Sequence, residues 1–236
     1  MKEEIIKEMT SLSEKEKEEI INTHIQNGVV IPIRSGIFIG KNVTVKKGTV
    51  ILTGSVLTGT TEIGENCHIG PDTWLYNTKV GKGASLNNVQ SYDSEISDSA
   101  DIGPYVHIRP NSHIEKGVHL GNFVEVKNSF IDSDTKVSHL TYIGDSDIGK
   151  NVNFGCGCVT VNYTGKEKFR TTVGNNCFIG CNTNLIAPVT IGDYGYTAAG
   201  STITNDVPEN ALGIARARQV NKENWVIQKK PYKNME

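Results

Sequence analysis

Aliphatic side chains recur at every sixth position over most of this chain. A first run consists of Ile39, Val45, Ile51, Leu57, Ile63, Ile69 and Leu75. A second run in the same phase consists of Ile96, Ile102, Ile108, Ile114, Leu120 and Val126. The rhythm slips by one residue at Val80, Ile131 and Ile148, then resumes at Val173, Ile179, Leu185 and Ile191. A fixed period sustained over so many positions indicates an internal structural repeat.

Each repeat carries the residues of one short strand and one tight turn. Two positions before the aliphatic residue stands a small or β-branched side chain, such as Thr49 or Cys67, and Gly often follows it, as at Gly64 and Gly70. Alternation of inward and outward residues indicates extended chain, and recurrent Gly permits a tight corner. Six residues cannot bury their apolar face alone, so coils must stack around a shared core. The sequence therefore predicts an all-β fold, a parallel β-helix of hexapeptide repeats.

The two ends differ from the repeat in kind. Residues 2–27 have helical spacing, with Ser13 and Glu16 placed as a capping box. We expect a short N-terminal helical arm over residues 1–30 and the β-helix over 31–207. After Val207 the rhythm stops. We expect the C-terminal segment, 208–236, to cover the exposed last rung of the solenoid or to pack on a neighbouring subunit.

Composition excludes several classes of function. The formal net charge of -2 gives no basic surface for nucleic acid. No apolar run approaches the length of a membrane span, and the polar N-terminus has no signal-peptide core, so we expect a cytoplasmic protein. An odd number of cysteines, 5, argues against a disulfide framework. We favour structural thiols over a zinc site, because three cysteines fall in the phase of the repeat.

The repeat is interrupted between Thr160 and Val173. The register requires about seven extra residues there, around the stretch NYTGKEKFR, and an external loop follows. On spacing alone this is a tolerated surface insertion. Departures from a rigid repeat also tend to carry function, because they project from a fixed support.

Specific motifs surround this loop: IRP, GNFVEVKNS, SHLTYIGD, NVNFGCG, VNYTGK and AAGSTIT. From about His24 to Trp225 the chain closely resembles the acetyltransferase half of the bifunctional glucosamine-1-phosphate acetyltransferase/N-acetylglucosamine-1-phosphate uridyltransferase family. That resemblance implies a left-handed β-helix with three hexads per coil, a homotrimer with active sites at subunit boundaries, and acetyl-CoA as cosubstrate. The uridyltransferase motifs of the family are not in this sequence, so we do not expect uridyl transfer from it.

The resemblance implies a set of catalytic and sugar-binding residues. His139 in SHLTY matches the general base that a primary amine needs before it can attack a thioester. Arg109, Lys127 and Lys168 match positions that hold the sugar phosphate, to which Arg offers a planar fork and Lys a point charge. The positions that bind sugar hydroxyls or orient the amine correspond to Tyr142, Asn153, Asn162 and Tyr163. Thr164 stands where the family usually has Asp, with an effect that the sequence does not define.

The resemblance also implies an acetyl-CoA site. Cys156 matches a position whose backbone N–H stabilises the thioester oxygen, and Cys181 replaces a serine. Ala199 and Gly200 match positions along the pantetheine arm. Arg216 and Lys222 match positions that meet the CoA phosphates.

Other interpretations compete with this one. Histidines 107, 113 and 119 are six apart, and some hexapeptide β-helices are zinc enzymes, but consecutive hexads should place these side chains on three different faces, so we expect no metal site. The acceptor could be another amino sugar. The chain could also be a non-catalytic trimeric partner of a separate nucleotidyltransferase. The joint presence of His139, Arg109 and Lys127 with the loop residues favours an enzyme.

Overall fold

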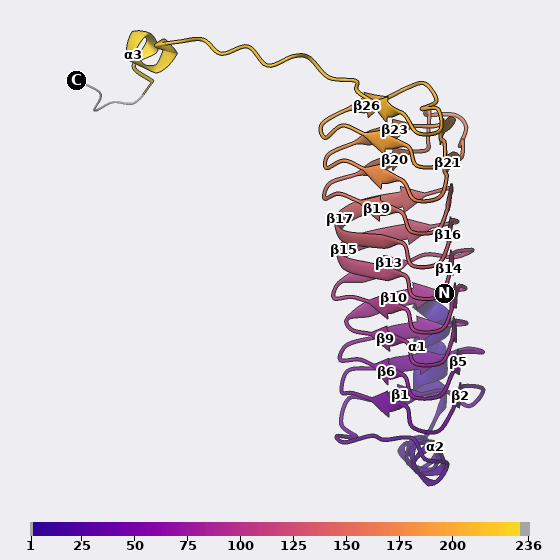
Figure 1. Ribbon diagram of the computed structural model, residues 1–236. Helices are drawn as coiled ribbons and strands as arrows, with labels where there is room; N and C mark the ends of the chain where they lie inside the picture. The colour runs from indigo at the N-terminus through magenta and orange to yellow at the C-terminus, as the bar shows by residue number, and fades with distance from the viewer. Residues whose placement is uncertain (1, 232–236) are drawn as a thin grey trace.

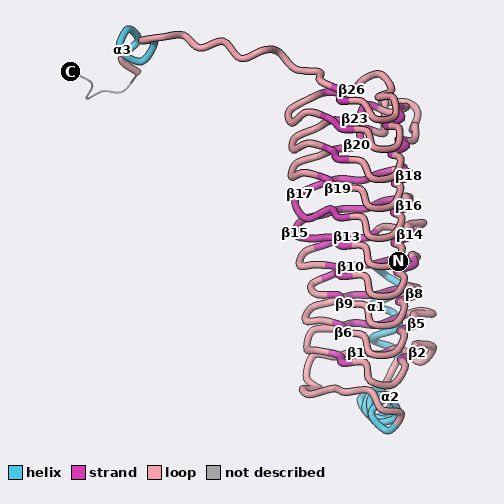
Figure 2. Tube along the Cα trace, in the orientation of Figure 1, coloured by secondary structure: helices cyan, strands magenta, loops and turns pink. Residues whose placement is uncertain are grey.

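The chain winds into a tall three-sided solenoid whose coils stack in parallel (Figure 1). This computed structural model describes residues 2–231. Thr44 pairs with Glu62, 18 residues later, and each coil carries one strand on each of three faces. The fold is the parallel β-helix of hexapeptide repeats that the sequence pattern predicts, with the left hand that the family resemblance implies. Most of each coil is turn and corner rather than strand (Figure 2).

The strands divide among three faces, numbered here in chain order within a coil. The first face holds β2 (Thr44–Val45), β5 (Glu62–Ile63), β8 (Lys79–Val80), β11 (Glu95–Ile96), β14 (His113–Ile114), β16 (Phe130–Ile131), β18 (Ser146–Ile148), β21 (Thr171–Val173) and β24 (Val189–Ile191). The second holds β3 (Val50–Ile51), β6 (His68–Ile69), β9 (Ser85–Leu86), β12 (Asp101–Ile102), the first part of β15 (His119–Lys127) and of β17 (Lys136–Gly144), β19 (Asn153–Phe154), β22 (Phe178–Ile179), β25 (Tyr196–Thr197) and β27 (Leu212–Gly213). The third holds β1 (Phe38–Ile39), β4 (Val56–Thr58), β7 (Trp74–Tyr76), β10 (Val89–Tyr92), β13 (Val106–Ile108), the later parts of β15 and β17, β20 (Val159–Val161), β23 (Asn184–Ile186) and β26 (Thr202–Ile203).

The six-residue aliphatic series forms the core. Ile51, Leu57 and Ile69 are 0% exposed, and the rest of the series is likewise buried. The small residues two positions earlier line the corners, where Thr49 Oγ1 donates to the carbonyl of Gly64 at 2.8 Å. Such bonds satisfy backbone acceptors that the turns leave unpaired.

Three cysteines occupy the same corner positions as these threonines. Cys67, Cys158 and Cys177 are buried. The thiol of Cys158 lies 3.1 Å from the carbonyl oxygen of Gly180, as a corner hydroxyl would. Burial raises the pKa of the Cys158 thiol to about 11. The prediction of structural thiols is confirmed for these three.

Two helices form the N-terminal arm. Ile5 of α1 (Lys2–Ser11) and Leu12, which follows this helix, pack against the third face, where they meet Phe38, Val56 and Tyr92. α2 (Glu14–Gln26) lies under the first coils and begins at the predicted capping box of Ser13 and Glu16 (Figure 1). No helix within residues 2–231 is both long and apolar enough to cross a membrane.

The C-terminal segment runs away from the last rung and ends in α3 (Trp225–Lys229) (Figure 1). Residues 214–231 are exposed, so in the single chain they do not fold over the end of the solenoid. The β-helix itself continues past Val207 to β27. Packing of this segment on a neighbouring subunit stays a prediction.

Substitution of Ile179 by Ala should lower the free energy of unfolding by about 3 kcal/mol, because the side chain is 0% exposed and leaves a cavity. The control is Phe178→Ala in the same strand, which deletes a larger side chain that is 39% exposed. Its cost should stay near 1 kcal/mol. Denaturant titrations at one fixed protein concentration measure the free energy of unfolding of both variants. Equal losses of stability would contradict the assignment of Ile179 to the core and Phe178 to the surface.

Candidate active site

Four predicted residues form a column along the corner between the second and third faces. They are His139, Cys156, Cys181 and Ala199, and all four are exposed. The residues two positions earlier pair in the same order on successive coils: Val137, Phe154, Ile179 and Thr197. Parallel strands lie about 4.8 Å apart, so the column is a regular track of that spacing.

The backbone beside this track is held in an unusual conformation. The residues that follow the four column members, Leu140, Gly157, Asn182 and Gly200, all have positive φ. Hydrogen bonds join the coils there: Gly157 N to Leu140 O at 3.0 Å, Asn182 N to Cys156 O at 2.8 Å and Gly200 N to Cys181 O at 2.8 Å. The track therefore rests on a fixed backbone.

The two predicted CoA-phosphate residues differ in position. Arg216 lies beside the upper end of the track, where a Cβ added to Gly200 would be 3.8 Å from its Cδ. Lys222 belongs to the exposed segment of residues 214–231. That segment runs away from the solenoid (Figure 1). The single chain does not bring Lys222 to the track.

A cationic pocket of about 520 Å³ occupies the opposite edge of the third face. Arg109 follows β13, Lys127 ends β15, and Lys168 comes from the inserted loop. Arg109 forms an ion pair with Glu125 at 3.0 Å and keeps 42% of its side chain exposed. The remaining lining residues are Pro110, Asn111, Asn128, Asp145, Phe169 and Arg170. The three cations predicted to bind phosphate thus line one pocket.

A buried carboxylate, Asp145, organises this pocket. Its side chain accepts hydrogen bonds from Lys127 at 3.1 Å, from Asn128 at 2.6 Å, and from Asn162. The side chain is only 6% exposed. Asp145 therefore fixes the ammonium of Lys127 and the amide of Asn162 at the entrance to the loop.

The electrostatics of the pair follow from these contacts. Burial alone would raise the pKa of the Asp145 carboxyl, but the hydrogen bonds from Asn128, Lys127 and Asn162 hold that pKa below its ordinary value. Burial likewise opposes the charge of Lys127, and the hydrogen bond with Asp145 outweighs it, so the pKa of the ammonium is raised. Both groups are charged at neutral pH.

The inserted loop is a small hairpin. Ser146 pairs with Thr171, 25 residues later, whereas Val173 pairs with Ile191, 18 residues later, which confirms the seven extra residues. An antiparallel bridge joins Tyr163 to Lys168. The hydroxyl of Thr164 accepts from the backbone N–H of Glu167 at 3.2 Å. A threonine at position 164 thus closes the turn, a role that an Asp side chain could also fill.

Arg170 anchors the far end of the loop. Its guanidinium donates to the carboxylate of Asp147 at 2.5 and 2.8 Å, and to the backbone carbonyls of Asn128 at 3.1 Å and Ser146 at 3.0 Å. Neither Arg170 nor Asp145 is among the site residues predicted from the sequence. The sequence shows only that an Asn or Asp recurs at one corner of successive coils, at Asn77, Asp93, Asn111, Asn128 and Asp145, where all five have positive φ in the structure.

Two further predicted residues flank the column. Tyr142 points outward on the third face, and its ring lies over Gly144 toward the cationic pocket. Asn153 points outward on the second face, in β19. Tyr163 is 57% exposed, and its hydroxyl donates to the carbonyl of Gly165 at 2.7 Å. His139 does not line the cationic pocket, but it lies on the same coil as Tyr142, at the opposite edge of the third face.

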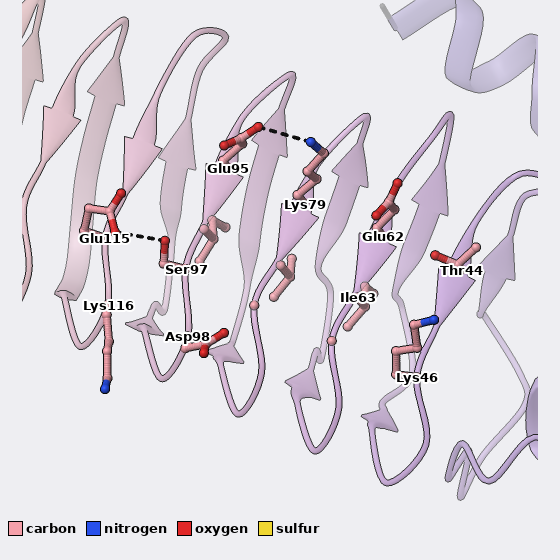
Figure 3. Close-up of a pocket in the computed structure, with 14 residues that line it drawn as sticks. Thr44, Lys46, Glu62, Ile63, Lys79, Glu95, Ser97, Asp98, Glu115 and Lys116 are labelled. Atoms are coloured by element: carbon pink, nitrogen blue, oxygen red, sulfur yellow. Dashed lines mark hydrogen bonds and ion pairs between the residues drawn. The ribbon is translucent and has the colours of Figure 1, made fainter.

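Two other features lie apart from these residues. His107, His113 and His119 fall on the third, first and second faces, which confirms that they diverge. A groove of about 600 Å³ crosses the first face (Figure 3). Its outward side chains alternate in charge, as in the pair between Lys79 and Glu95 at 3.4 Å. No residue predicted for catalysis or binding lines this groove.

Known proteins provide an independent comparison. A family model described as bacterial transferase hexapeptide (six repeats) matches residues 170–205. The bifunctional protein GlmU of Geobacillus sp. (strain WCH70) is 51% identical over 224 residues, which are 94% of this chain and 49% of that protein. GlmU of Clostridioides difficile (strain 630) is 46% identical over 222 residues, 94% of this chain and 48% of that protein. The chain spans about half the length of these curated relatives.

Among solved structures, an Arabidopsis UDP-N-acetylglucosamine acyltransferase aligns over 88% of this chain and 77% of that one. The sequence identity is 15% and the TM-score 0.49, a likeness too weak to bear on function.

Substitution of Asp145 by Asn should lower the free energy of unfolding by about 3 kcal/mol at neutral pH, because it leaves the ammonium of Lys127 without its counter-charge. The control is Asp147→Asn, which removes the half-exposed pair with Arg170 and should cost under about 1 kcal/mol.

Acidification provides a second readout for the same variant. The folded-state pKa of Asp145 is depressed, so its contribution is complete above the unfolded value of about 4 and is lost as the pH falls through the folded pKa. The difference in stability between wild type and Asp145→Asn should therefore shrink in acid. A difference that stays constant across this pH range would contradict the assigned role.

Proposed function

The chain is a member of the GlmU family that spans about half of its relatives' length, and on that premise we propose that it transfers the acetyl group of acetyl-CoA to the amine of glucosamine 1-phosphate. The observation that carries this proposal is the arrangement across the third face at and just below the coil of β17. His139 and the track lie at one edge of the third face, and the cationic pocket lies at the other.

His139 is assigned the proton transfer. An ammonium has no lone pair with which to attack a thioester, so a base must take one of its protons before the carbon–nitrogen bond can form. The imidazole is exposed at the corner and leads the column that contains Cys156 and Cys181. Nitrogen attacks the acetyl carbon directly, the tetrahedral adduct collapses, and CoA leaves as a thiol, so no acyl-enzyme is needed.

The cationic pocket is assigned the phosphate. Arg109, Lys127 and Lys168 converge on it from two coils and the loop. Asp145 neutralises part of that charge, which keeps the cations together when no ligand is bound. A sugar phosphate would complete the charge balance with hydrogen bonds from ionised donors.

We assign the sugar-binding surface to the third face, between the edge with the track and the edge with the cationic pocket. From Thr141 to Gly144 an extended strand covers roughly 10 Å, comparable with the length of a sugar phosphate. Tyr142 lies on this surface, and the loop with Asn162, Tyr163 and Lys168 forms its wall. Asn153 stands on the other side of the column, where it can orient the amine.

The track is assigned to the pantetheine arm of acetyl-CoA. Cys156, Cys181, Ala199 and Gly200 run along it, with Arg216 at the upper end near the CoA phosphates. A backbone N–H at Cys156 would stabilise the negative oxygen of the tetrahedral adduct. Lys222 could contribute only if the C-terminal segment folds back on this subunit or on a neighbour.

We infer a homotrimer from an exposed apolar series beneath His139. Tyr105, Phe123 and Leu140 follow one another at the same corner and are 59%, 60% and 59% exposed. Their φ values of 60°, 61° and 40° are unfavourable for bulky side chains. The rings of Tyr105 and Phe123 stack at 5.4 Å. Strain that displays apolar groups to solvent is consistent with a contact surface for a neighbouring copy.

Substitution of His139 by Ala should lower kcat by about 10²- to 10⁴-fold, because the proton acceptor is lost. The assay follows release of free thiol from acetyl-CoA with glucosamine 1-phosphate and with a panel of other amino sugars. The matched control is His113→Ala, an exposed histidine on the first face, which should leave kcat unchanged. Absence of activity in wild type with every amino sugar would overturn the proposed function.

Substitution of Phe123 by Asp should shift the protein from trimer to monomer in sedimentation velocity experiments, because a charge is placed in the apolar contact. Asp tolerates positive φ better than Phe, so the coil itself should not be weakened. The control is Tyr194→Asp, an aromatic residue with φ of 57° and 53% exposure at a different corner. A Phe123→Asp protein that remains trimeric would exclude this surface from the interface.

A further inference from the structure

Two of the five cysteines differ from the others in position. Cys67, Cys158 and Cys177 are buried at corners of the core, whereas Cys156 and Cys181 are exposed. The two exposed thiols belong to successive coils and are neighbours in the track, between His139 below and Ala199 above. Direct acetyl transfer does not require a thiol from the protein, so their pairing calls for a separate explanation.

The geometry brings these two residues within bridging range. Phe154 pairs with Ile179, which places Cys156 directly beneath Cys181, and Asn182 N donates to Cys156 O at 2.8 Å. Adjacent parallel rungs are about 4.8 Å apart, inside the window of roughly 4.4–6.8 Å between Cα atoms that disulfides occupy. The thiol of Cys181 also leans over the lower coil, since a Cβ added to Gly155 would lie 2.8 Å from its sulfur.

We propose that Cys156 and Cys181 are a redox-modification site, which closes to a disulfide by exchange with the disulfide of CoA and thereby blocks the track. The choice of CoA disulfide rests on the proposed function, because acetyl transfer releases the CoA thiol in this track. The bridge itself depends only on the two thiols and their spacing.

The exchange balances in two steps. One cysteine thiolate attacks a sulfur of CoA disulfide, forms a mixed disulfide and releases one CoA thiolate, which takes up a proton. The second cysteine thiolate attacks the protein sulfur of that mixed disulfide and releases the second CoA thiol. Two protein thiols are oxidised, one CoA disulfide is reduced to two thiols, and a small thiol reverses the sequence.

The test treats the native full-length protein with CoA disulfide, removes the reagent by desalting, and then records intact mass, a non-reducing peptide map and acetyl transfer. Wild type should lose the mass of two hydrogen atoms without keeping an adduct, and the map should link Cys156 to Cys181. Acetyl transfer should fall to background and return to its starting rate after dithiothreitol. Oxidised glutathione should produce the same bridge more slowly, since it lacks the groups that the track would bind.

The single variants Cys156→Ala and Cys181→Ala supply the comparison, each measured against its own untreated rate. Each should retain one CoA as a mixed disulfide, because the partner thiol that would expel it is absent. The proposal is overturned if wild type keeps both exposed thiols free, retains an adduct, or links another pair. If the Cys156–Cys181 bridge forms but no amino sugar accepts acetyl, the site stands and the proposed function fails.

Discussion

Each coil of this solenoid can bury its aliphatic side chains only by sitting in register on the coil before it. A hexapeptide supplies one inward aliphatic residue and one small corner residue, and neither is shielded from water without the coil above and below. Register therefore fixes the outward residues as strictly as the inward ones. His139, Cys156, Cys181 and Ala199 form a straight column because the core beneath them repeats.

The insertion shows how chemistry is added without disturbing that register. Seven extra residues leave the stack after β20 and return at β21, where pairing with β18 continues. Hydrogen bonds fix both ends of the loop. The amide of Asn162 donates to the carboxylate of Asp145 at one end, and the guanidinium of Arg170 donates to the carboxylate of Asp147 at the other. A loop with two fixed ends therefore places Lys168 in the same pocket as Arg109 and Lys127. A flexible loop would have to lose more conformational entropy on binding a sugar phosphate.

Much of this arrangement follows from the sequence. The aliphatic period predicts the rungs, the three diverging histidines and the length of the insertion, because a six-residue repeat leaves no freedom in where each residue points. Other contacts could not be read in this way. The hydrogen bonds that Asp145 accepts from Lys127, Asn128 and Asn162 join residues 17 or 18 positions apart. In the sequence, an Asn or Asp at a turn looks the same whether it only closes the turn or lies at the centre of an ionic cluster. Lys222 belongs to a segment without the six-residue repeat, so no period predicts its position.

The central claim is that the third face presents a proton acceptor at one edge and a phosphate site, built from two lower coils and the inserted loop, at the other edge to a single sugar. A crystal structure of the protein with CoA and N-acetylglucosamine 1-phosphate, the products of the proposed reaction, addresses it most directly. We predict the phosphate among Arg109, Lys127 and Lys168, the acetamide nitrogen beside His139, and the CoA sulfur along the Cys156–Cys181 track. Phosphate bound outside that cationic pocket, or an acetamide far from every copy of His139, would contradict the account.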